Sequence, residues 1–205
     1  MTDTLSDARR PRDALKTRDS ILDAAQALIL DHGYGATTVD AVVARAGITK
    51  GAFFHHFVSK AQLARALVER YAALDREHLG KRLERARKLA TDPLQRLLLL
   101  VSLYEEDFES LEEPFPGCLF ASYVYENKLF DDAVLEVLRE SALWWRAQIR
   151  MLLDEVVAVD IESLADLFYA LPEGAFVMTQ TLADRTLLPK QVRHLRTYHE
   201  LLFAR

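Results

Sequence analysis

The sequence has few of the residues that interrupt helices or cross-link a chain. Its 205 residues include one Cys, 7 Gly and 6 Pro. The single thiol, Cys118, excludes an internal disulfide and a zinc site built from several cysteines. So few Gly and Pro also argue against the many tight turns of a β-sandwich or β-barrel. We therefore expect a helical chain that holds neither a metal nor another cofactor.

Long hydrophobic runs and a signal-peptide pattern are missing as well. The longest uninterrupted apolar runs, such as residues 97–101, have five residues, far fewer than the roughly 20 that span a bilayer. No short basic segment followed by an apolar stretch opens the chain. We expect a cytoplasmic protein with no membrane partner.

Charge is present but unevenly distributed. Hydrophobic residues make up 50% and charged residues 28% of the chain, the composition of a globular protein with a core. The net charge is −5. Residues 1–60 hold 8 Lys and Arg against 7 Asp, whereas residues 61–205 hold 18 Lys and Arg against 24 Asp and Glu. A slightly basic N-terminal part on an acidic remainder is compatible with local contact to nucleic acid.

Apolar residues recur at helical spacing along most of the chain, and no alternating strand pattern of useful length occurs. The fold class that this predicts is all-α, with about nine helices. A polar N-terminal arm, 1–15, precedes them, and Gly80 is expected to bend the fourth. The expected helices are 17–32, 39–46, 50–56, 60–90, 93–111, 117–126, 131–157, 160–182 and 189–203.

Two short helices, 39–46 and 50–56, have the pattern of a helix-turn-helix. Thr38 and Thr49 are suited to cap their N-termini, and Gly47 supplies a left-handed turn between them. The second helix of such a unit enters the major groove of DNA with its N-terminal half. Small residues there, Gly51 and Ala52, allow the backbone to approach the bases, while Thr49 and Lys50 can donate hydrogen bonds.

Residues 17–63 closely resemble the N-terminal DNA-binding domain of the TetR family of transcriptional regulators. The matching features lie in one order at the spacing of that family. They are Ala24-Ala25, Gly33-Tyr34, Thr37-Thr38, Arg45-Ala46-Gly47, Thr49-Lys50-Gly51, His56-Phe57 and Ser59-Lys60. Beyond them, the run Pro116 to Leu119 is of a kind that some members carry. The resemblance covers about a quarter of the chain and implies a DNA-binding domain at 16–62, followed by an effector-binding and dimerisation domain at 63–205.

The resemblance also implies the roles of individual residues. Thr38 and Lys60 match positions that contact phosphate, and residues 49–52 match the start of the recognition helix. Phe54 stands where the family usually has a Tyr, so His55 is expected to supply a polar contact instead. Asp40 either accepts from a cytosine amino group or favours the helix N-terminus, and we favour the second role. The full set expected to contact DNA is Thr38, Arg45, Thr49, Lys50, Gly51, Ala52, Phe54, His55 and Lys60.

By the same resemblance, the protein is a homodimeric transcriptional regulator, most simply a repressor. Its expected partners are a near-palindromic double-stranded operator and a small, mostly apolar effector. Dimerisation is expected through the last two long helices, with Leu164, Leu167, Phe168, Ala175, Phe176, Leu187, Leu195 and Leu201. Part of an aromatic-rich set is expected to line the effector pocket, the rest being ordinary core: Tyr104, Phe108, Cys118, Phe120, Tyr123, Trp144, Trp145 and Phe176.

Several alternatives stay open on the sequence alone. Cys118 is either an inert packed thiol or a redox sensor. The acidic run at 105–113 is either a solvated face or a site for a cation. A ligand-binding protein without DNA affinity and an enzyme built on a helical bundle are the rival functions. We do not expect an enzyme, because the sequence has no phosphate-binding glycine loop, metal-ligand set or paired nucleophile and base.

Overall fold

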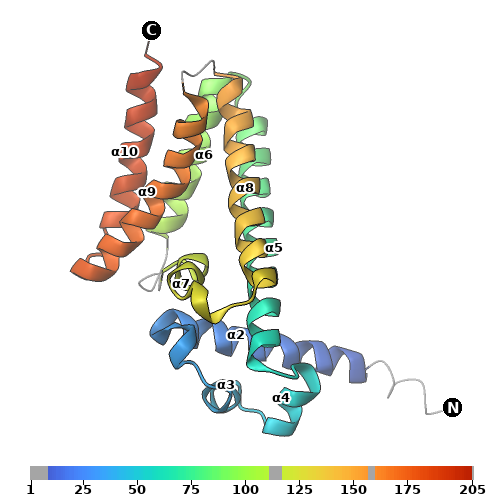
Figure 1. Cartoon of the computed structure of the whole chain (residues 1–205). Helices are drawn as coiled ribbons and strands as arrows, with labels where there is room; N and C mark the ends of the chain where they lie inside the picture. Colours follow the sequence, from blue (N-terminus) through green and yellow to red (C-terminus); the bar gives the residue numbers. More distant parts are fainter. Residues whose placement is uncertain (1–8, 111–116, 157–159, 205) are drawn as a thin grey trace, which may run out of the picture. The chain divides into compact units, whose positions relative to one another are not determined.

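A computed structural model describes residues 9–110, 117–156 and 160–204, and side chains from residue 14 onward. These residues form nine α-helices, one short 3₁₀ helix and no strand (Figure 1), which confirms the all-α prediction. The α-helices are α2 (Arg9–Ala36), α3 (Val39–Ala46), α4 (Lys50–His56), α5 (Lys60–Leu89), α6 (Pro93–Glu109), α7 (Leu119–Tyr125), α8 (Asp132–Asp154), α9 (Ile161–Leu182) and α10 (Leu187–Leu202); the 3₁₀ helix is η1 (Asn127–Leu129).

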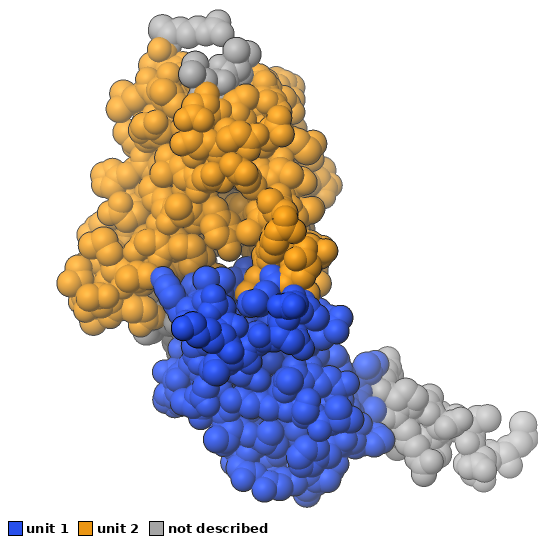
Figure 2. All heavy atoms as spheres, in the orientation of Figure 1, with its two compact units in different colours: residues 1–71, 119–135 blue, residues 72–118, 136–205 orange. Residues whose placement is uncertain are grey.

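The chain divides into two compact units (Figure 2). Unit 1 comprises Met1–Tyr71 and Leu119–Leu135, and unit 2 comprises Ala72–Cys118 and Glu136–Arg205. Helices α5 and α8 each contribute residues to both units. Packing thus groups 63–71 and 119–135 with the helix-turn-helix, although the sequence pattern placed them in the C-terminal domain.

Helix boundaries differ from the sequence expectation where tertiary contacts or local chemistry override the pattern. Helix α2 begins at Arg9 rather than at residue 17; Pro11 lies in its first turn, where a missing N–H is tolerated. Helix α5 is one 30-residue helix that continues through Gly80, so the expected change of direction there was wrong. Helix α8 ends at Asp154, earlier than the expected residue 157. The other helix ends lie close to their expected positions, and Asp92 caps the start of α6.

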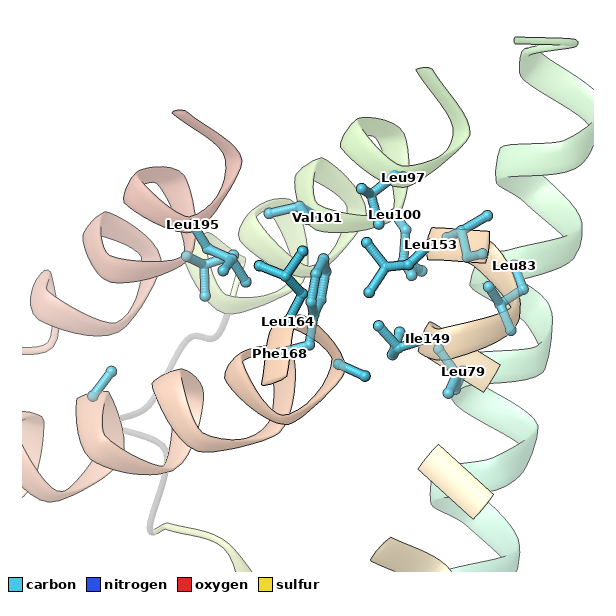
Figure 3. Close-up of a cluster of buried hydrophobic side chains, with 14 of the residues drawn as sticks. Leu79, Leu83, Leu97, Leu100, Val101, Ile149, Leu153, Leu164, Phe168 and Leu195 are labelled. Carbon is cyan, nitrogen blue, oxygen red and sulfur yellow. The ribbon is translucent and has the colours of Figure 1, made fainter. Parts of the chain in front are cut away.

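The core of unit 2 is built from one apolar face of each of five helices (Figure 3). Leu79 on α5, Leu100 on α6, Ile149 and Leu153 on α8 and Phe168 on α9 are at most 6% exposed. Their spacing of three or four residues along each helix places them on a single face. Burying such a side chain stabilises the fold by about 1.5–3 kcal/mol.

This core uses most of the residues that the sequence pattern had suggested for dimerisation. The buried ones are Leu164, Phe168, Ala175, Phe176 and Leu195. That interface assignment was therefore wrong for these five, because helical periodicity identifies an apolar face without identifying what covers it. Leu201, which belongs to the expected set, is exposed on α10. The side chains exposed on α9, Val177, Met178 and Leu182, were not in that set.

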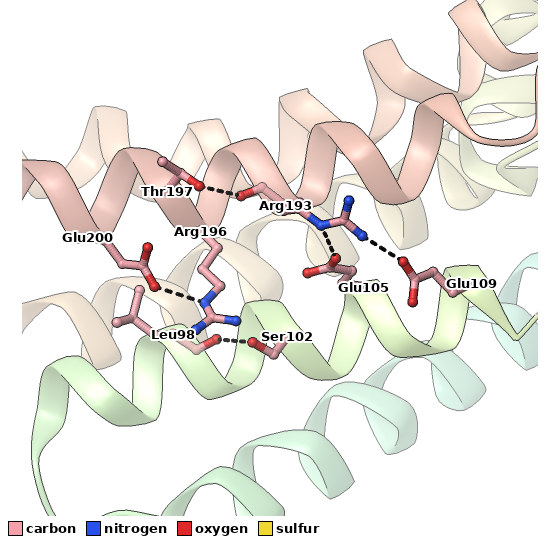
Figure 4. Close-up of polar contacts among 8 residues, drawn as sticks. All are labelled: Leu98, Ser102, Glu105, Glu109, Arg193, Arg196, Thr197 and Glu200. Carbon is pink, nitrogen blue, oxygen red and sulfur yellow. Dashed lines mark hydrogen bonds and ion pairs between the residues drawn. The ribbon is translucent and has the colours of Figure 1, made fainter.

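The acidic run on α6 is partly neutralised within unit 2. Arg193 on α10 donates to Glu105 at 2.5 Å and to Glu109 at 2.8 Å (Figure 4). Arg82 on α5 pairs with Asp107. Three of the carboxylates in the described part of this run are thus held by arginines, which supports a structural reading of the run. Glu112 and Glu113 lie outside the described residues.

Candidate functional site

The helix-turn-helix in unit 1 is shaped by caps that the local sequence supplies. The Ala41 N–H donates to Thr38 Oγ1 at 3.1 Å, and the Ala52 N–H donates to Thr49 Oγ1 at 3.1 Å. Between the two helices, Gly47 adopts the left-handed conformation, with φ 66° and ψ 32°. The N–H groups of Gly47 and Ile48 then donate to the last carbonyls of α3. The predicted caps and turn are confirmed.

Aromatic packing fixes the recognition helix α4 from its inner side. Phe53 is fully buried and Phe57 is 1% exposed, and their ring centroids lie 5.9 Å apart. Phe54 is 51% exposed on the other side. A Cβ built on Gly51 would meet nothing nearer than Thr49 Oγ1 at 3.8 Å. The fold therefore does not itself require glycine there, and the N-terminal face of α4 is open to a partner.

The polar side chains around α4 are exposed and lightly paired. Lys50, the first residue of α4, donates to Asp40 Oδ1 on α3 at 2.7 Å, with side-chain exposures of 62% and 68%. Arg45 approaches Asp31 at 3.8 Å. Exposed pairs of this kind contribute only about 0–1 kcal/mol, so both cations remain available to a polyanion. Thr38, Thr49 and His55 are also exposed, whereas Ala52 is partly covered.

Lys60 is more firmly held than the sequence suggested. Its Nζ donates to the Tyr34 carbonyl at 2.6 Å and lies 4.0 Å from the centroid of the Tyr34 ring. A longer contact of 3.4 Å reaches the Gly35 carbonyl. Burial lowers the pKa of Lys60, and the nearby Glu126 carboxylate opposes that effect. An ammonium has three donors, so one donor remains for a phosphate.

The helix that carries Lys60 begins with a variant of the capping box. The Gln62 N–H donates to Ser59 Oγ at 3.1 Å, while the Gln62 side chain accepts from the Val58 N–H at 2.7 Å rather than from the Ser59 N–H. His56 is partly buried, and desolvation, His55 and Arg18 lower its pKa. Within the described residues, no group of three or more His, Cys, Asp or Glu could hold a metal ion.

The residues expected to line an effector pocket divide between the units. Tyr104, Phe108, Trp145 and Phe176 form a chain of ring contacts in unit 2, with centroid distances of 5.7–6.2 Å. The Cys118 thiol donates to the Glu173 carboxylate. The Arg76 guanidinium carbon lies 5.8 Å from the centroid of the Trp144 ring. Phe120 and Tyr123 belong to unit 1 instead. The Phe120 ring centroid lies 4.8 Å from that of Tyr71, and the Tyr123 ring centroid lies 4.3 Å from that of Phe130.

Three polar residues in the aromatic cluster of unit 2 were not predicted from the sequence: Asp75, Tyr169 and Glu173. Trp145 Nε1 donates to Asp75 Oδ2 at 2.6 Å, and the Tyr169 ring lies 6.5 Å from the Trp145 ring. Burial is the main cause that raises the pKa of both Asp75 and Glu173. The signal was present for Asp75, which interrupts the buried stripe of Ala72, Leu79 and Leu83 at helical spacing.

Comparison with known proteins adds independent evidence. Residues 21–67 match the family model described as bacterial regulatory proteins, tetR family. The HTH-type transcriptional activator FasR of Mycolicibacterium smegmatis is 27% identical over 165 residues, which cover 76% of this chain and 73% of FasR. The HTH-type transcriptional repressor KstR2 of the same species is 31% identical over 102 residues, which cover 50% of this chain and 46% of KstR2.

A similar solved structure is a TetR transcriptional regulator from Chloroflexus aurantiacus. It is 27% identical, with a TM-score of 0.74 over 91% of this chain and 96% of that one. The similarity therefore extends through the helices after α5, beyond the segment that the family model matches. None of the described helices has the length and apolar character needed to cross a membrane.

Proposed function

The chain belongs to the TetR family of bacterial regulatory proteins, DNA-binding transcriptional regulators, and we propose that it is a cytoplasmic homodimeric repressor released from its operator by a small effector. The observation that carries the DNA-binding part is the capped α3–α4 pair, whose second helix exposes Thr49, Lys50 and Gly51 at its N-terminus. We propose repression because it requires only occupation of the operator. The named relatives include both an activator and a repressor.

On this proposal the N-terminal half of α4 lies in the major groove. Thr49, Lys50, Gly51 and Ala52 face base edges, where a good bidentate contact discriminates by about 1–3 kcal/mol. Residues around that half contact the backbone: Thr38, Arg45, His55 and Lys60. Phe54 has no hydroxyl to donate, so its exposed ring makes only apolar contact there.

A homodimer accounts for apolar surface that unit 2 leaves uncovered. Val177, Met178 and Leu182 on α9 are 47–58% exposed, and Leu201 on α10 is 73% exposed. Two helices from each subunit would form a four-helix interface of the size typical of obligate dimers, above about 2,000 Å². A two-fold dimer requires a near-palindromic operator, with half-site centres about 34–36 Å apart or somewhat more.

The proposed effector site is the aromatic cluster of unit 2. Tyr104, Phe108, Trp145 and Phe176 would contact an apolar body, and Asp75 and Glu173 would face its polar or cationic group. The effector must bind the state with low operator affinity better than the other state, or it shifts nothing. Moving the equilibrium from 1:99 to 99:1 requires about 5.5 kcal/mol per dimer, which two sites can share.

Selection of bound duplexes from a random pool tests this proposal. We expect a near-palindromic sequence that the protein binds with salt-dependent affinity, measured by fluorescence anisotropy at several salt concentrations. Light scattering of the same preparation should give the mass of two chains. No salt-dependent binding to any duplex would favour a ligand-binding protein without DNA affinity. A particle with the mass of one chain would contradict the dimer.

A further inference from the structure

The backbone that joins α2 to α3 is held in an unusual conformation. Gly33 interrupts α2 with φ 82° and ψ 163°, values that an L-residue rarely adopts. After this break, Thr37 Oγ1 donates to the Gly33 carbonyl at 2.8 Å, and the Thr37 N–H donates to the Tyr34 carbonyl at 3.2 Å. Thr38, the cap of α3, follows directly. The start of the helix-turn-helix therefore depends on how residues 33–37 are held.

A carboxylate from a distant part of unit 1 holds this turn. Glu126 lies between α7 and η1, and its Oε1 and Oε2 accept from the N–H groups of Tyr34 at 2.8 Å and Gly35 at 2.7 Å. A Cβ on Gly33 would lie 2.3 Å from Glu126 Oε1, and one on Gly35 would lie 3.0 Å from Oε2. Both glycines thus leave space that the carboxylate occupies.

The opposite side of the same turn is held from the start of α5. Lys60 donates to the Tyr34 carbonyl, so this residue is bound through its N–H by Glu126 and through its C=O by Lys60. The Tyr34 ring packs on Phe130 at 4.4 Å, next to Tyr123, whose hydroxyl donates to the Ala64 carbonyl at 3.1 Å. Segment 119–130 is therefore joined to the residues that flank α3 and α4 on either side.

We propose that Glu126 is a positioning residue for operator recognition, which fixes the backbone from which α3 and the recognition helix are built. This inference rests on the proposed DNA-binding function. A carboxylate cannot itself attract phosphate, so any gain in operator affinity from Glu126 must come from placement. Segment 119–135 is joined in sequence to unit 2 at both ends. Glu126 is thus one of the contacts through which a change transmitted along either connection would reach the helix-turn-helix.

Glu126→Gln tests the inference, with Glu140→Gln on the exposed surface of α8 as the charge-matched control. The Gln side chain keeps the shape, but its NH₂ opposes one of the two backbone N–H donors. We expect operator affinity about tenfold lower, as for loss of a charge-assisted hydrogen bond, with an unchanged salt slope. Amide exchange at Tyr34 and Gly35 should become faster. The control should bind as tightly as the wild type or more tightly.

Gly35→Ala provides a second, independent perturbation. It retains the Glu126 charge but places a methyl group against Oε2 and against Leu129, so it should lower operator affinity in the same way. If both changes act through the contact between Glu126 and the turn, their effects should not be independent. The double variant should then lose less operator affinity than the product of the two single losses. Should Glu126→Gln fail to fold, Gly35→Ala alone decides the matter.

The possible results separate the two hypotheses. A wild type that binds the selected operator, together with variants of equal affinity, overturns the role of Glu126 and leaves the proposed function intact. A lower thermal midpoint without any change in operator affinity would also overturn it, because it would show a purely structural contact. A wild type that binds no duplex overturns both.

Discussion

Replacement of Asp40 by Asn should strengthen binding to DNA of any sequence. Asp40 holds the Lys50 ammonium at 2.7 Å in the free protein. Lys50 is the first residue of α4, where the helix dipole disfavours a cation, so the pair offsets an unfavourable position. In the wild type, the pair must break before Lys50 can bind DNA, and this costs free energy. The variant lacks the pair, so its Lys50 binds DNA without that cost. The variant also removes a negative charge from the surface that faces the operator.

The size of the effect follows from the exposure of the pair. With both side chains more than 60% exposed, the ion pair contributes about 0.2–1 kcal/mol, a factor of up to about five in affinity. In the wild type, each phosphate ~10 Å from the Asp40 carboxylate also repels it by about 0.4 kcal/mol before screening. We expect affinity for an unrelated duplex to rise about 3- to 10-fold. The salt slope should become steeper by about 0.9, because the surface that meets the DNA carries one negative charge fewer.

Fluorescence anisotropy with the operator and with an unrelated duplex, at several salt concentrations, measures both quantities. Asp19→Asn removes the same charge from α2 and is the matched control. In a Lys50→Ala background, Asp40→Asn should lose most of its effect. Weaker operator binding by Asp40→Asn, with unrelated DNA unaffected, would refute this reasoning. That result would instead indicate that Asp40 accepts from a cytosine, with about 1–3 kcal/mol at stake.

Four further outcomes are expected. Lys60→Ala should weaken binding to all duplexes and reduce the salt slope by about 0.9, as measured by the same titrations. Met178→Glu should give the mass of a single chain in light scattering, because it places a charge on the exposed apolar face of α9. Leu153→Ala should lower the free energy of unfolding in urea by about 2–5 kcal/mol, since Leu153 is fully buried. Burial raises the pKa of Glu173 in the folded state, so the folded protein binds more protons than the unfolded chain. The free energy of unfolding should therefore fall as the pH rises through that pKa. Glu173→Gln should flatten this fall in urea titrations between pH 4 and 8.

Sequence-local chemistry was sufficient to predict the helix-turn-helix. The caps at Thr38 and Thr49 each bond to an N–H three residues ahead, and the Gly47 turn closes within five residues. Such features depend on a few adjacent residues, so they can be inferred without knowledge of the rest of the fold. The same holds for the α6 start at Asp92 and Pro93.

Contacts between distant residues were beyond the sequence pattern. Glu126 and Gly35 are 91 positions apart, and nothing in the spacing of either predicts their hydrogen bond. Phe120 and Tyr123 have the same helical, aromatic pattern as Tyr104 and Phe108, yet they lie in unit 1. The pattern shows which side of a helix is apolar, whereas the identity of its neighbour depends on the path of the whole chain.

The division of apolar surface between core and exposed face likewise depends on the tertiary structure. Phe176 and Val177 are adjacent apolar residues on α9, but the first is 9% and the second 50% exposed. The sequence by itself determined the helices and the helix-turn-helix, because these depend on short-range periodicity and capping, and its motifs carried the resemblance to the family. Only the tertiary structure decided which residues clamp the helix-turn-helix, which aromatic rings meet in unit 2 and which apolar face stays open, because each depends on side chains far apart in sequence that packing brings together.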